Sequence, residues 1–206
     1  TINALQADLA TAAGCQQLLD AAGEVDILVN NLGIFETKDF EEITDTDWQR
    51  FFEINVMSGV RLARGQLAGM KRRGWGRIVF ISSESGICPP GAMVHYGMSK
   101  SAQLSVSRGL AETCSGTGVT VNAVLPGPTR TECVRDFFAK LASDAGQTLD
   151  ETEAAFFKHA RPTSLLQRFI EPPEVAALVA YVCSPRAAAT HGVALRVDGG
   201  VVRSLI

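Results

Sequence analysis

Short apolar runs alternate along this 206-residue chain with longer stretches in which apolar residues recur every three or four positions. The runs are rich in Val, Ile and Phe and are bounded by Gly, Ser or Asn, a pattern typical of buried strands in a parallel sheet. We expect strands at residues 2–9, 25–29, 78–81, 118–124 and 193–197. The periodic stretches predict helices at residues 12–22, 46–73, 92–113 and 171–183.

The helix expected at residues 46–73 opens with a capping signature. Thr46 stands at the cap and Gln49 follows three residues later, so each side chain can satisfy a backbone donor of the other. Asn55 lies in the helix interior, although asparagine competes with the backbone for hydrogen bonds and disfavours such positions. It is either a buried amide satisfied by the core or a functional side chain.

The candidate chemistry is concentrated between Arg77 and Lys100. Ser83 follows the strand end, and Tyr96 and Lys100 stand four positions apart in the next helix, so both project from one face. A nearby lysine cation favours the phenolate, so we predict a lowered pKa for Tyr96 and a role as acid or base near neutral pH. Ser83 would hold and polarise the reacting oxygen. A surface helix with one aromatic anchor gives the same short pattern.

Residues 132–169 form a long helical connection between two strands, in which Phe137, Phe138, Phe156 and Phe157 stand among charged residues. Long connections of this kind are often functional lids, so we interpret residues 132–170 as a cover over the substrate. The aromatic pairs are equally well explained as core contacts between two short helices.

Composition restricts the class of protein. With 46% hydrophobic and 20% charged residues the chain can bury one sizeable core, and a net charge of −3 gives no basic surface for nucleic acid. No apolar stretch is long enough to cross a bilayer and no signal peptide opens the sequence, so we expect a soluble, cytoplasmic protein with no nucleic-acid or membrane partner. Five scattered cysteines without a C-x-x-C pair favour free thiols over disulfides or a metal site.

Several motifs occur in a characteristic order around the Tyr96 centre. They are Asp26-Ile27-Leu28-Val29-Asn30-Asn31-Leu32-Gly33, then Asn55, Ser83, Tyr96, Lys100 and Pro126-Gly127. With them the chain resembles the classical short-chain dehydrogenase/reductase family from Asp8 to Gly200. The resemblance implies an α/β fold with a doubly wound, Rossmann-like parallel sheet in three α/β/α layers, with residues 1–206 as one domain. The three spacers between Tyr96 and Lys100 favour this type over the enoyl reductases.

The resemblance also implies an activity and a catalytic set. The expected function is an NAD(P)-dependent oxidoreductase that interconverts a secondary alcohol and a ketone by hydride transfer. Tyr96 would be the general acid/base, Lys100 would keep the phenol acidic and hold the nicotinamide ribose, and Ser83 would bind the substrate oxygen. Asn55 would perturb its helix and hold a water linked to Lys100.

The same resemblance assigns cofactor contacts, for NAD or NADP. Asp8 would lie beside the adenine ring, Thr129 near the nicotinamide amide, and Thr131 would offer a hydroxyl. Leu32 departs from the family pattern, which has a small residue there. The full set is Asp8, Leu9, Asn30, Asn31, Leu32, Gly33, Tyr96, Lys100, Pro126, Gly127, Thr129 and Thr131.

The family's strand numbering makes residues 2–9 the third strand and residues 25–29 the fourth, which are not neighbours in a dinucleotide-binding sheet. No glycine-rich phosphate turn occurs in the sequence. We therefore expect that a first βαβ portion is absent from this chain, that cofactor binding by these residues alone is weak, and that NAD or NADP preference is not encoded here. Substrate identity is likewise not encoded.

Two further expectations concern partners. In relatives the helix after Lys100 and the long helix before it pair between subunits, so we expect a homodimer or homotetramer, with the tail at residues 201–206 packed on a neighbouring subunit. The alternative to an enzyme is a catalytically silent binding or scaffold protein with the same fold. The presence of all four catalytic positions favours the enzyme.

Overall fold

The computed structural model of the protein describes residues 2–205, as an α/β fold on a four-stranded parallel sheet in the order β1-β2-β3-β4. The strands are β1 (Ile27–Asn30), β2 (Gly76–Ile81), β3 (Val119–Pro126) and β4 (Ala194–Val197). The α-helices are α1 (Ala12–Ala22), α2 (Asp45–Phe52), α3 (Ser58–Arg73), α4 (Val94–Glu112), α5 (Glu132–Ala145), α6 (Leu149–His159) and α7 (Pro172–Cys183). A π-helical turn, Glu53–Met57, joins α2 to α3, and short 3-10 turns occur at Phe40–Glu42, Glu84–Gly86, Gly91–Met93 and Pro185–Ala187.

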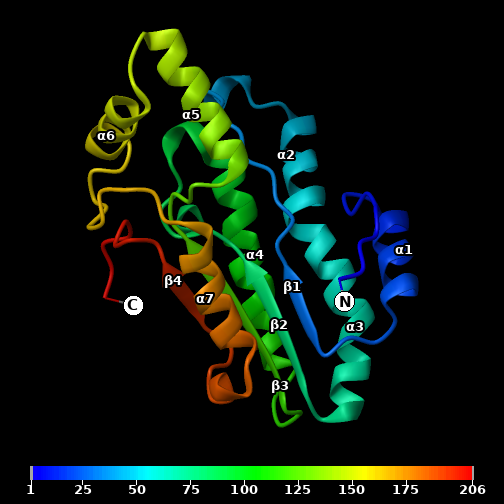
Figure 1. Ribbon diagram of the computed structural model, residues 1–206. Coiled ribbons are helices and arrows are strands. Elements are labelled where there is room, and N and C mark those ends of the chain that lie inside the picture. The colour runs from blue at the N-terminus through cyan, green and yellow to red at the C-terminus, as the bar shows by residue number, and fades with distance from the viewer. Residues whose placement is uncertain (1, 206) are drawn as a thin grey trace.

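Helices cover both faces of the sheet and give the three layers that were predicted (Figure 1). On one face α3 and α4 pack against Ile78, Phe80 and Val121, all fully buried. On the other face α7 packs against Val79 and Val124. Because β2 and β3 are central and covered on both sides, their sequences are continuously apolar. The doubly wound, Rossmann-like class is confirmed.

The strand expected at residues 2–9 is wrong. Residues 2–8 adopt no regular secondary structure, and within residues 2–205 β1 pairs only with β2. A strand without a neighbour has no partner for its backbone groups, so the apolar alternation alone does not make one. Instead the Asp8 carboxylate accepts a hydrogen bond from the Ala10 backbone N–H, and the Thr11 side chain caps α1.

The first capping signature is also displaced. Helix α2 begins after Thr44, two residues before Thr46, and its capping box joins Thr44 to Asp47 instead of Thr46 to Gln49. Lys38 binds the same Asp47 carboxylate at 2.7 Å, which adds an ion pair that the Thr46 register would lose. Both threonines fit the sequence rule, and this long-range contact favours the first.

Helices α5 and α6 lie together at one end of the molecule, with an aromatic cluster between them (Figure 1). Phe138, Phe157 and Phe169 are buried there and Phe156 packs on them, with ring centroids 4.9 to 5.5 Å apart. The interpretation as core contacts therefore holds for Phe138, Phe156 and Phe157. Phe137 is the exception, because it is 50% exposed.

The remaining expectations of the chain have mixed outcomes. All five cysteines are free. Across residues 2–205 no helix combines the length and the apolar character needed to span a bilayer. At the C-terminal end Val201 and Val202 are buried within the chain itself, so for these two residues packing against another subunit is wrong, and Ile206 lies outside the described residues.

Candidate active site

The site forms where β2 ends and α4 begins. Ser83 follows the last residues of β2 and is buried, and its side chain lies near enough to Tyr96, in the first turn of α4, to lower the pKa of the phenol. The Ser82 hydroxyl donates to the Lys100 carbonyl at 2.8 Å and fixes the strand end against the helix. The structure therefore brings together the hydroxyl and the phenol that the sequence predicted.

Lys100 lies one helical turn beyond Tyr96 and is 5% exposed. Its ammonium donates to the Ile81 carbonyl at 2.9 Å and lies 5.7 Å from the centre of the Tyr96 ring. Gly33, in the loop after β1, faces the same ammonium, since a Cβ at this position would lie 3.2 Å from Nζ. The glycine therefore leaves open space beside the lysine.

Asn55 occupies the π-helical turn, where the helix is one residue wider than an α-helix. Its amide donates to the Ile34 carbonyl at 3.0 Å and to the Ser99 hydroxyl at 2.9 Å, and its oxygen accepts from the Ile34 N–H at 2.8 Å. The side chain is fully buried and ties the loop after β1 to α4. The predicted helix perturbation at Asn55 is confirmed, because π-turns of this kind interrupt the α-helical ladder.

The pKa values differ from the expectation for Tyr96. Burial raises the pKa of Tyr96 to about 12, although the Ser83 hydrogen bond acts in the opposite direction. Burial lowers the pKa of Lys100 to about 8. The predicted lowering of the Tyr96 pKa is therefore wrong for this structure, because desolvation of the phenolate is the largest effect on that pKa.

Two site residues were missed by the sequence reasoning, Glu84 and Arg161. Glu84 follows Ser83 directly and is buried, and it accepts a hydrogen bond from the Ser83 hydroxyl at 2.5 Å. Arg161, just after α6, donates to the same carboxylate through Nε at 3.1 Å. An acidic residue between two serines of a buried loop was the available signal for Glu84, whereas nothing in the sequence indicated its partner.

The predicted cofactor contacts divide into two groups. Asn30, at the carboxyl end of β1, has a buried side-chain amide without a hydrogen-bond partner on either atom, and Gly33 lies beside Lys100. Gly127, after β3, approaches the Asp198 carbonyl so closely that a Cβ would lie 2.6 Å from it. The Thr129 hydroxyl donates to the Gly127 carbonyl at 2.9 Å. All of these residues follow the carboxyl ends of strands, where ligands bind in open α/β sheets.

The other residues predicted to contact the cofactor make different contacts or lie away from Tyr96 and Lys100. The Thr131 side chain caps α5. Asp8 and Leu9 lie in the turn before α1, and no described contact joins them to the catalytic four. The Leu32 side chain is 39% exposed. Among residues 2–205 no group of three or more His, Cys, Asp or Glu side chains could hold a metal ion.

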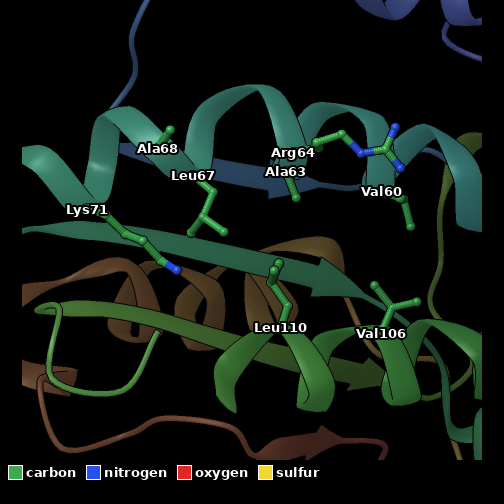
Figure 2. Close-up of a pocket in the computed structure, with 8 residues that line it drawn as sticks. All are labelled: Val60, Ala63, Arg64, Leu67, Ala68, Lys71, Val106 and Leu110. Carbon is green, nitrogen blue, oxygen red and sulfur yellow. The ribbon is translucent and has the colours of Figure 1, made fainter. Parts of the chain in front are cut away.

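A separate apolar groove of about 380 Å³ lies between α3 and α4, away from these residues (Figure 2). Figure 2 shows Leu67 of α3 pointing toward Leu110 of α4, with Val60 and Val106 beside them. The groove is lined by Val60, Ala63, Arg64, Leu67, Ala68, Lys71, Val106 and Leu110.

Known proteins resemble this chain over nearly its whole length. A family model described as enoyl-(acyl carrier protein) reductase matches residues 3–202. The uncharacterized oxidoreductase YvaG of Bacillus subtilis (strain 168) is 51% identical over 198 residues, which cover 96% of this chain and 75% of that protein.

Solved structures agree with the sequence relatives. The L-sorbose reductase of Gluconobacter frateurii, solved with NADPH and L-sorbose, is 31% identical and superposes with a TM-score of 0.89 over 97% of this chain and 76% of its own. A protein described as a short chain dehydrogenase/reductase family protein is 32% identical, with a TM-score of 0.81 over 95% of this chain and 75% of its own.

Proposed function

Because the chain belongs to the classical short-chain dehydrogenase/reductase family, we propose that it interconverts a secondary alcohol and a ketone, with Tyr96 as the general acid/base. Family members are oxidoreductases that use NAD or NADP. The observation that carries the proposal is the contact of Ser83 with Tyr96, one helical turn from a buried Lys100. Such a group of proton donors and acceptors suits a reaction in which an oxygen gains or loses a proton.

In the reducing direction Tyr96 gives its hydroxyl proton to the ketone oxygen while the carbonyl carbon receives a hydride. In the oxidising direction the phenolate takes the proton from the alcohol. When bound, a nicotinamide supplies or accepts the hydride. A pKa of about 12 makes Tyr96 a weak acid, so proton transfer from Tyr96 near neutral pH requires added stabilisation of the phenolate. Lys100, whose ammonium lies 5.7 Å from the centre of the Tyr96 ring, is the cation proposed to supply it.

The other residues of the site hold and orient the reacting groups. Ser83 binds the reacting oxygen, and Lys100 stays fixed by the Ile81 carbonyl. Asn55 holds the loop of Gly33 against α4 through its contacts with Ile34 and Ser99, which keeps the space beside Lys100 open. A water path from Asn55 to Lys100 remains part of this proposal.

The residues present fit the nicotinamide end of a cofactor. Asn30 offers a buried amide with two unsatisfied atoms, and Gly33 leaves room next to the Lys100 ammonium. Lys100 and the backbone near Gly127 and Thr129 would hold the ribose and the amide of the nicotinamide. Their positions after strand ends support this assignment.

Residues 132–170 are proposed as the substrate cover. Helices α5 and α6 follow β3 directly, and Arg161 brings the end of α6 to Glu84, beside Ser83. A cover in this position would exclude water from the reacting oxygen. The identity of the residues that contact substrate depends on the substrate, for which L-sorbose, the ligand of the Gluconobacter structure, is one test compound.

The proposed partner is a second copy of the chain. The groove between α3 and α4 exposes apolar side chains on two long helices, with Arg64 and Lys71 among its lining residues (Figure 2). Exposed apolar patches on helix pairs often mark association surfaces. This supports pairing of α3 and α4 between subunits.

The test of the proposed chemistry is Tyr96→Phe. We expect turnover to fall by about 10²- to 10⁴-fold, because the phenol proton is lost while the ring still packs. Oxidation of reduced nicotinamide would be followed by absorbance with a panel of ketones that includes L-sorbose. Tyr181→Phe, at the chain's only other tyrosine, is the matched control and should leave the rate unchanged.

Two outcomes would contradict the proposal. A near-normal rate for Tyr96→Phe would remove Tyr96 from the mechanism. If the wild-type chain binds reduced nicotinamide, as measured by fluorescence, but turns over no compound of the panel, the scaffold function is favoured instead.

A further inference from the structure

A chain of side-chain contacts runs from the catalytic phenol to the end of the substrate cover. The Ser83 side chain lies near Tyr96 and lowers the pKa of the phenol, the Ser83 hydroxyl donates to Glu84 Oε2 at 2.5 Å, and Glu84 Oε1 accepts from Arg161 Nε at 3.1 Å. Glu84 lies just beyond β2, whereas Arg161 lies just beyond α6. The ion pair therefore joins the catalytic loop to a segment 77 residues later in the chain.

The ion pair is more deeply buried than most others in the molecule. The Glu84 side chain is 6% exposed and that of Arg161 is 17% exposed. Burial of a charge costs several kcal/mol unless a partner compensates it. Each member of the pair therefore depends on the other, and displacing Arg161 would leave an uncompensated carboxylate beside Ser83.

The pair determines what Ser83 can do. A hydroxyl has one proton to donate, and in this structure Ser83 donates it to Glu84. Its oxygen accepts instead, from the Ser85 N–H at 3.1 Å. To bind a substrate oxygen as a donor, Ser83 must turn away from Glu84.

The pair also places two opposite charges near the phenol. The Glu84 carboxylate raises the pKa of Tyr96 and the Arg161 guanidinium lowers it, both acting less than burial and the Ser83 hydrogen bond. Lys100 is the other charged group that faces the ring. With both members of the pair in place their effects oppose each other, and loss of either one leaves a net charge.

We infer that Glu84 and Arg161 are positioning residues for the Ser83 and Tyr96 pair, and that docking of the α6 end on the catalytic loop sets the donor direction of Ser83 and the charge facing Tyr96. The inference rests on the proposed function, in which Tyr96 is the acid/base. It extends that function by making the substrate cover part of the proton chemistry.

The test measures Tyr96 itself and needs no substrate. In the full chain with Tyr181→Phe, Tyr96 is the single tyrosine, and its phenolate fraction can be followed by ultraviolet absorbance at a fixed alkaline pH. Glu84→Gln should raise the phenolate fraction and Arg161→Gln should lower it, each by about two- to fivefold, since a partly buried charge nearby is lost. The double variant should lie between the two single variants.

A matched control and a conservative variant test whether Glu84 and Arg161 act on Tyr96 or only stabilise the fold. Glu153→Gln breaks the Arg130–Glu153 ion pair, which joins α6 to the loop after β3, has side chains 35% and 17% exposed, and makes no described contact with Ser83. It should leave the phenolate fraction unchanged. Arg161→Lys should restore most of the value lost in Arg161→Gln, because it retains the cation.

The outcomes are distinguishable from those of the proposed function. Shifts of opposite sign for Glu84→Gln and Arg161→Gln support the inference, even if no substrate is turned over. Shifts of the same sign, or shifts no larger than that of Glu153→Gln, would overturn it and leave the pair as a structural tether. If Arg161→Gln fails to fold, an unchanged phenolate fraction in Glu84→Gln would overturn it as well.

Discussion

At the scale of single residues, burial dominates the titration of the site. Tyr96 and Lys100 both have pKa values displaced toward the neutral form, to about 12 and about 8. The two groups nevertheless lie close enough for a cation and a phenolate to stabilise each other once either ionises. The site therefore holds two groups that burial favours in their neutral forms.

Lys100 predicts a specific pH dependence of stability. Its folded-state pKa of about 8 is below the unfolded value of 10.5, so between these values the unfolded chain binds the extra proton and stability rises with pH. We expect the free energy of unfolding, relative to Lys100→Met, to increase by about 2 kcal/mol from about pH 7 to about pH 9.5.

Urea unfolding of both proteins at the two pH values measures this difference. The range stays below the pH at which Tyr96 contributes, because the raised pKa of Tyr96 lowers stability only above the unfolded tyrosine value of 10.0. A relative stability that is flat or falls with pH would show that Lys100 is not desolvated as described.

The candidate site was predictable from the sequence to the extent that it follows helix and strand geometry. The four-residue spacing placed Tyr96 and Lys100 on one face, and the strand end placed Ser83 beside them. Residue spacing carries no information about burial, so the direction in which the Tyr96 pKa shifts was predicted wrongly. The partner of Glu84 was also out of reach, because an ion pair across 77 residues depends on the folded cover.

At the scale of elements, regular structure followed the sequence wherever packing and local pattern agreed. Helix α1 has the predicted bounds, and β2 and β3 lie on the predicted apolar runs. The segment at residues 2–9 failed because a strand needs a hydrogen-bonded neighbour, which periodicity cannot supply. The start of α2 moved to Thr44 because a Lys38 ion pair selects between two equivalent caps.

The aromatic cluster predicts that residues 132–159 are stabilised as one unit. Phe157 is 1% exposed and packs on Phe156 and Phe169, so Phe157→Ala should cost about 3 to 5 kcal/mol. We expect the loss to appear as faster amide hydrogen exchange in α5 and α6, with little change in the sheet.

Phe137→Ala is the matched control, because its ring is half exposed and touches only the edge of the cluster through Phe138. It should change exchange rates far less. Equal acceleration in the sheet and in α5 and α6 would show that the cover does not open independently.

At the scale of the whole molecule, two surfaces stand out. Strand β1 forms one edge of the sheet and exposes Ile27 and Val29, and the groove of α3 and α4 exposes a second apolar area. The proposed catalytic residues lie in a third region, at the carboxyl ends of the strands. Association through the groove would therefore leave access to Ser83 and Tyr96 unobstructed.

The groove predicts a change of assembly on mutation. Ala68→Arg adds bulk and charge at an exposed lining position, so we expect it to shift the protein toward monomer in sedimentation velocity experiments. Leu141→Arg, at an exposed apolar position of α5, is the control and should leave the sedimentation coefficient unchanged. If the wild-type chain sediments as a monomer at all concentrations, pairing through α3 and α4 is wrong.

The π-helical turn at Glu53–Met57 makes the catalytic centre sensitive to chain length. Each residue of a helix advances its neighbours by about 100° around the axis, so deleting one residue from this turn would restore an ordinary helix and rotate the Asn55 amide away from Ile34. The helix would still span the same distance and cover the same sheet. Deletion of one residue here would thus leave the fold intact but release the loop after β1, which Asn55 holds in place, and the proposed activity would be lost.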